Sequence, residues 1–164
     1  MRRIVSLLPL LLLFAIQAAA SEITRDSVLA SMNAYRAEKG LPALRFDARL
    51  QKAADDRMRD MEEQEYWAHE APDGRSPFTW VRAERYDFEF AGENLACGFE
   101  TTELLVSSWM ESPGHRDNIL SPLYADCAIA IIDGSTRGRA AGKSIVVMFG
   151  RQHGPEVQAV AKKE

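Results

Sequence analysis

The spacing of the apolar residues changes along this chain, and that change restricts the fold more than any other feature. Between residues 26 and 65 they recur every three or four positions, which predicts two amphipathic helices with their charged residues on the wet face. Residues 127–132 and 144–150 are short runs rich in Ile and Val, which predict two paired strands. Helices first and an antiparallel pair last predict an α+β fold of packed layers.

Helix-breaking and capping residues divide the chain into these elements. Gly40 and Pro42 end a first helix over about 26–39, and Asp47 caps a second helix that ends near 65. The other expected elements are a short helix after Ser76 and Pro77, an extended segment over 87–90 interrupted by Gly92-Glu93-Asn94, a helix over 102–111 and a further turn over 115–120.

The N-terminus has the composition of a signal peptide. Arg2 and Arg3 precede an apolar stretch, and Ala18-Ala19-Ala20 supplies the small residues of a cleavage site. The stretch is about 13 residues long, short of the roughly 20 that span a bilayer, although an uncleaved membrane anchor is the alternative. We therefore expect a signal peptide over 1–20, one domain over 21–152, a polar tail over 153–164, and an exported protein, periplasmic or secreted, with no other integral membrane segment.

The charge of the chain limits the classes of expected partner, and its cysteine content limits the expected disulfide bonds. With 24 acidic against 20 basic residues and a formal net charge of -4, nucleic acid is not an expected partner. Without a coiled-coil seam, we expect a monomer. Because export leads to an oxidising compartment, we predict a disulfide between Cys97 and Cys127, the only two cysteines. The alternative is two buried small residues that never meet.

Two histidines and one glutamate are the candidate chemical groups. His69 and His115 each follow a break in a helical pattern, and Glu93 lies between Gly92 and Asn94. Imidazole binds zinc or copper and moves protons, and a carboxylate either fixes its tautomer or binds the metal. The histidines are far apart in sequence, so structural hydrogen bonds are the alternative for each residue.

Four motifs, taken in order, resemble the bacterial branch of the CAP superfamily, or SCP-like extracellular domain. Its relatives include cysteine-rich secretory proteins, antigen 5 and pathogenesis-related proteins of class 1. The resemblance covers about residues 27–151. The motifs are Asn33-Ala34-Tyr35-Arg36 with Gly40-Leu41-Pro42-Ala43-Leu44, Tyr66-Trp67-Ala68-His69 with Pro72-Asp73-Gly74, Gly92-Glu93-Asn94-Leu95-Ala96, and Trp109-Met110-Glu111-Ser112-Pro113-Gly114-His115-Arg116-Asp117-Asn118-Ile119-Leu120.

The resemblance implies a three-layer α-β-α sandwich with a central antiparallel sheet. It also implies a cleft of two histidines and two acidic residues, which binds zinc or magnesium in several relatives. His69, Glu93 and His115 match three of these positions. Ser112 stands where eukaryotic relatives have a glutamate, and Glu111 lies one residue early, so either is a possible fourth cleft residue. We therefore expect an open site that binds metal weakly.

Five further motif residues are expected to support the cleft. Their side chains either satisfy backbone groups of the surrounding loops, which is the favoured interpretation, or contact a ligand. They are Asn33, Arg36, Asn94, Arg116 and Asn118.

Three functions remain open from the sequence. The first is a non-catalytic binding module for a small ligand, a lipid, a cell-wall fragment or a protein. The second is a metal-dependent hydrolase of peptides or cell-wall material, with Glu93 as the base. The third is a structural or signalling protein of the cell surface with a vestigial cleft.

Overall fold

The computed structural model describes residues 21–134 and 142–154. The predicted signal peptide, and the predicted tail beyond residue 154, lie outside these residues. In chain order the elements are α1 (Arg25–Glu38), β1 (Arg45–Phe46), α2 (Ala48–Glu63), α3 (Phe78–Ala83), β2 (Phe88–Phe99), α4 (Thr102–Glu111), α5 (Pro113–Ile119), β3 (Asp126–Asp133) and β4 (Lys143–Gln152).

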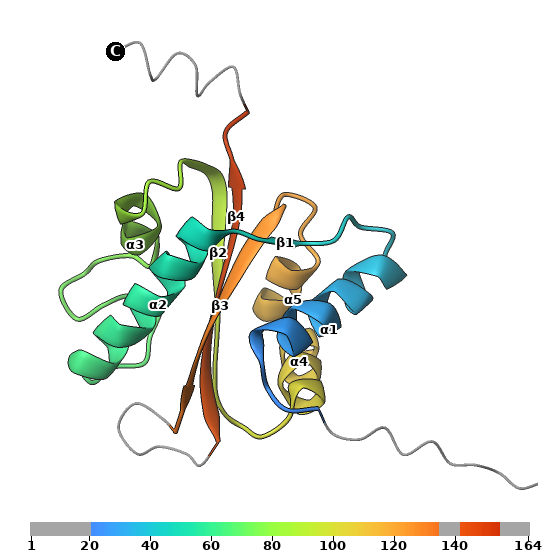
Figure 1. The fold of residues 1–164 in the computed structure, drawn as a ribbon, viewed down its shortest axis with the longest axis horizontal. Helices are drawn as coiled ribbons and strands as arrows, with labels where there is room; N and C mark the ends of the chain where they lie inside the picture. The colour runs from blue at the N-terminus through green and yellow to red at the C-terminus, as the bar shows by residue number, and fades with distance from the viewer. Residues whose placement is uncertain (1–20, 135–141, 155–164) are drawn as a thin grey trace, which may run out of the picture.

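The strands form a central sheet in the order β1-β3-β4-β2. Strands β2, β4 and β3 are antiparallel, and the two-residue β1 adds to β3 in parallel. Helices α2 and α3 cover one face of the sheet, and α1, α4 and α5 cover the other (Figure 1). This confirms the three-layer sandwich.

The apolar runs near the C-terminus are consecutive because both faces of the sheet are buried. Successive side chains of a strand point to opposite faces. On β4, Ile145, Val147 and Phe149 pack in the core under α1, α4 and α5, whereas Val146 and Met148 pack in the core under α2 and α3. Strand β4 therefore contributes side chains to two separate cores.

One predicted interruption is wrong. Gly92, Glu93 and Asn94 lie inside the continuous strand β2, each in register with a residue of β4. Gly92 serves a close approach here: a Cβ on it would lie 2.5 Å from the hydroxyl oxygen of Tyr124. Glycine therefore signals side-chain packing against the strand instead of a turn.

The predicted disulfide is also wrong, because β4 lies between the two cysteines. Cys97 is in register with Ser144 of β4, and Cys127 is in register with Phe149 on its other side. These partners are about 16 Å apart along the strand, and two strand spacings separate the cysteines across it. A disulfide needs Cα atoms within about 7 Å. Both thiols are free, and burial raises the pKa of Cys127 to about 12.

Candidate functional site

Two adjacent residues of β2 point to opposite layers, and each contacts a segment that carries a histidine. The Glu93 carboxylate faces α2 and the loop that follows it, where it contacts His69. The Asn94 side chain faces α5, where its Nδ2 donates to the carbonyl oxygen of His115 at 3.0 Å. Since β2 is an outer strand of the sheet, the two histidine segments approach its edge from opposite faces.

The His69 ring is oriented by Glu93. Nδ1 of His69 lies 2.8 Å from Oε1 of Glu93, and donation from Nδ1 to the carboxylate leaves Nε2 directed away from it. The His69 side chain is 59% exposed, whereas that of Glu93 is 1% exposed. The hydrogen bond to Glu93 raises the pKa of His69 above its ordinary value, and partial burial opposes this.

The second carboxylate oxygen of Glu93 is bonded to a residue that sequence reasoning missed. Nε of Arg57 donates to Oε2 of Glu93 at 3.2 Å, and the Arg57 side chain is 0% exposed. The sequence pattern assigns charged residues of α2 to the wet face, so this expectation is wrong for Arg57. One signal was available: Arg57 falls in the same helical stripe as Ala53, Ala54 and Met61, all of them buried.

His115 lies in the first turn of α5. Its ring centroid is 6.4 Å from that of Trp109. Burial, and after it the positive charge of His69, lower the pKa of His115 below its ordinary value. The positive charge of His69 therefore adds to the effect of burial on His115, whereas the pKa of His69 is raised by Glu93.

Side chains of the fourth motif and of the loop after it seal the free edge of β2. Nδ2 of Asn118 donates to the side-chain Oδ1 of Asn94 at 2.8 Å. Three side chains donate to backbone carbonyl oxygens of β2 that face this edge. Tyr124 Oη donates to Ala91 at 3.3 Å, Asn118 Nδ2 donates to Glu93 at 3.2 Å, and Trp109 Nε1 donates to Leu95 at 3.2 Å. Such bonds satisfy an edge that would otherwise be open to another strand.

The remaining support residues contact backbone. Asn33 exchanges two hydrogen bonds with the backbone of Leu44, at 3.0 and 2.8 Å. Arg36 donates to four backbone carbonyl oxygens, three in loops and one at the end of α5, and Arg116 donates to the carbonyl oxygen of Met110 at 3.3 Å. In this structure these side chains bond to backbone groups, and contact with a ligand stays a prediction.

Comparison with known proteins agrees with this architecture. The sequence model of the cysteine-rich secretory protein family, CAP, matches residues 29–149. The chain belongs to this family. The Bacillus subtilis protein YkwD is 37% identical over 101 residues, and the B. subtilis membrane protein YlbC is 28% identical over 108 residues. These matches cover 62% and 66% of this chain, but only 39% and 31% of the two relatives.

Solved structures of other bacterial proteins show the same fold. An extracellular protein with an SCP domain from Bacillus anthracis has a TM-score of 0.68 and 23% identity, over 78% of this chain and 40% of that one. An outer surface protein of Borrelia burgdorferi has a TM-score of 0.69 and 20% identity, over 82% of this chain and 100% of that one. Within the described residues of this CAP chain, no helix is long and apolar enough to cross a membrane.

Both candidates for the fourth cleft position of the family lie at the junction of α4 and α5. Ser112 is the residue between the two helices. Glu111 lines a hollow of about 480 Å³ with Phe99 and Leu104. Neither residue has a described contact with His69 or Glu93.

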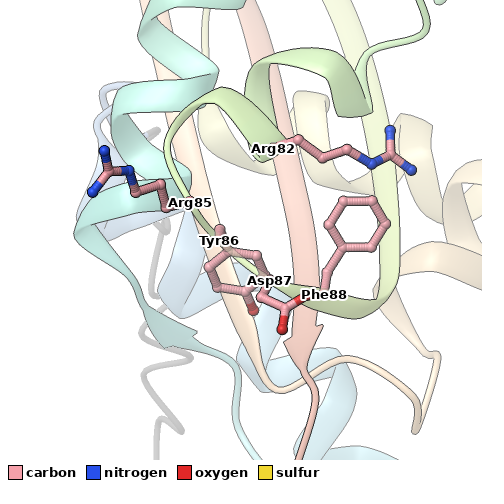
Figure 2. A pocket seen from close by; sticks show the side chains of 5 residues that line it. All are labelled: Arg82, Arg85, Tyr86, Asp87 and Phe88. Atoms are coloured by element: carbon pink, nitrogen blue, oxygen red, sulfur yellow. The ribbon is translucent and has the colours of Figure 1, made fainter. Parts of the chain in front are cut away.

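Among the hollows of the described surface are three that neither cleft histidine lines. One lies between α4 and the end of β2, and a second, of about 280 Å³, lies between α1, α2 and β3. The third, of about 300 Å³, lies beside the start of β2 (Figure 2). There the Arg82 guanidinium lies 4.8 Å from the centre of the Phe88 ring, and Arg85 points away from Arg82.

The donor atoms available near His69 and His115 can be compared with the ligands that zinc and magnesium prefer. Across residues 21–134 and 142–154, no three His, Cys, Asp or Glu side chains are arranged to hold a metal ion. Both oxygens of Glu93 already bond to protein groups, so the donors left are the imidazoles of His69 and His115. Imidazole nitrogen suits zinc, whereas magnesium prefers oxygen ligands. The donor chemistry of these residues therefore suits zinc better than magnesium.

Proposed function

We propose that this CAP protein is an exported, non-catalytic binding module whose ligand site is the His69–His115 pair at the edge of β2. A divalent ion of the zinc class would bind the imidazole nitrogens. Water or an anionic group of a small molecule, lipid or cell-wall fragment would complete its coordination.

The observation that carries this proposal is the contact between the exposed His69 and the buried Glu93. Metal-binding histidines commonly donate their second ring nitrogen to a carboxylate, which fixes the tautomer and makes the other nitrogen a better ligand. The 2.8 Å contact from Nδ1 to Oε1 has this arrangement. His115 supplies a second imidazole, whose lowered pKa favours the neutral, ligand-competent form.

The contacts of Glu93 favour binding over hydrolysis. A general base for a metal-bound water must reach that water with a free oxygen. Glu93 is buried, and its two oxygens bond to His69 and Arg57. We therefore assign Glu93 to orienting His69.

Export is supported by two separate features. The first twenty residues have the composition of a signal peptide. Two relatives of the same fold are described as an extracellular protein and an outer surface protein.

Zinc titration by calorimetry tests the proposal. We expect one zinc ion to bind, with a loss of affinity of about tenfold or more in His69→Ala and in His115→Ala. His153→Ala is the matched control, because it removes the remaining histidine, which lies 3.8 Å from Asp87 and outside the site. Magnesium should not bind measurably. If both site variants bind zinc like the unmodified protein, the proposed site is wrong.

A further inference from the structure

Arg57 connects the two halves of the His69–Glu93 pair. Besides its bond to the carboxylate of Glu93, its Nη2 donates to the carbonyl oxygens of Ala68 at 2.6 Å and of His69 at 2.8 Å. One buried side chain therefore bonds to the backbone that carries the histidine and also to the carboxylate that orients its ring.

Aromatic contacts fix the Arg57 guanidinium. Its central carbon lies 4.7 Å from the centre of the Trp80 ring and 5.3 Å from that of Tyr66. Nη1 also donates to the hydroxyl of Tyr66, which in turn donates to Asp60, and Asp60 accepts a bond from Arg75 at 2.9 Å. A planar guanidinium suits this site, because it stacks on rings while donating in several directions in its plane.

From these contacts we propose that Arg57 is the positioning residue of the histidine site. It fixes the loop of His69 relative to the Glu93 carboxylate, so that the ring presents Nε2 at the edge of β2. It also occupies the second oxygen of Glu93 and so keeps that carboxylate from becoming a third metal ligand. This inference rests on the proposed function for its ligand, but the positioning itself is measurable without any metal.

Arg57→Lys tests the proposal because it keeps the positive charge but not the fork of donors. Amide hydrogen exchange over residues 67–71, compared with exchange in β3 of the same sample, measures the positioning. Zinc calorimetry measures its effect on the ligand. We expect local exchange to accelerate on the order of tenfold while β3 changes little. Zinc affinity should fall by a similar factor.

Gln51→Ala is the control for general destabilisation. Gln51 is a buried polar residue of the same helix, but it bonds to the backbone of Ile129 in β3, at 2.9 and 3.1 Å. We expect this variant to lower the unfolding midpoint while leaving exchange over residues 67–71 and zinc affinity unchanged.

The outcomes separate the two proposals. If exchange over residues 67–71 is the same in Arg57→Lys as in the unmodified protein, the positioning role is overturned, whatever zinc does. If the unmodified protein binds no zinc but Arg57→Lys loosens the loop, the positioning role stands and the proposed function fails. Should Arg57→Lys not fold, Tyr66→Phe takes its place, since it removes one partner of Arg57. Unchanged exchange in that variant would then overturn the proposal.

Discussion

Helices α1 and α2 lie on opposite faces of the sheet, and each buries one arginine in its C-terminal half (Figure 1). Arg36 of α1 donates to the carbonyl oxygens of Pro42, Ile119, Ser121 and Tyr124, and burial lowers its pKa. Arg57 of α2 bonds to two carbonyl oxygens and also to a carboxylate.

The two buried arginines differ in what they bond to: Arg36 supports backbone, whereas Arg57 also bonds to a carboxylate of the candidate site. By donating to backbone carbonyl oxygens, Arg36 fixes the path of loops and of the end of α5. The carboxylate beside Arg57 adds a charged group that in turn orients an exposed imidazole. The same residue type therefore supports only backbone on one face and organises a candidate site on the other.

The largest expected effect comes from removing the arginine that faces a carboxylate. Arg57→Met should lower the free energy of unfolding by about 3–5 kcal/mol, because Glu93 would stay buried without its cation. Urea denaturation measures the change. The double variant Arg57→Met with Glu93→Leu should regain part of the loss, since it removes the stranded charge. No regain would mean that the ion pair is not the source of the effect.

Arg36→Met should have a smaller effect. It leaves carbonyl oxygens without a donor but no uncompensated charge, so we expect a loss of about 1–3 kcal/mol in the same measurement. A loss as large as that of Arg57→Met would remove the distinction between the two arginines.

The two faces should also respond to pH in opposite senses. His69 on the α2 face has a raised pKa, so its contribution to stability is present below the ordinary value of 6.5 and lost as pH rises through the raised pKa. His115 on the α5 face has a lowered pKa, so its contribution is present above 6.5 and lost as pH falls. Nuclear magnetic resonance titration of the two rings measures both.

Glu93→Gln sharpens this pH contrast. It removes the carboxylate that raises the pKa of His69, so that pKa should fall, while the pKa of His115 should stay below its ordinary value because burial is the main cause of its lowering. A His69 pKa that stays raised in this variant would show that Glu93 is not the cause.

The smallest effects are expected where the two helices end. α1 ends with Gly40 at φ 67°, and α2 ends with Glu65 in the same left-handed region at φ 52°. Glu65→Gly should therefore stabilise the protein by about 0.5–1 kcal/mol, and Gly40→Ala should destabilise it by about 1 kcal/mol, because only glycine adopts this region without steric cost. Thermal unfolding distinguishes the two signs.

The sequence predicted the elements whose signals are local. Asp47 caps α2 as expected, with its side chain accepting from the backbone N–H groups of Arg49 and Leu50. The helix over 102–111 and the two Ile- and Val-rich strands lie where their patterns place them. The predicted interruption of β2 was wrong because Gly92 makes room for Tyr124, a residue far along the chain that local sequence patterns do not reveal.

Residue types and spacing thus determined the layered α+β class, the ends of the long helices and the identity of His69, Glu93 and His115 as candidates. The tertiary structure alone decided that β4 separates the cysteines and that Arg57 is buried beside Glu93. The reason is physical. Helix caps and apolar periods depend on neighbours in sequence, whereas strand order and the partner of a buried charge depend on which distant segments share a face of the sheet.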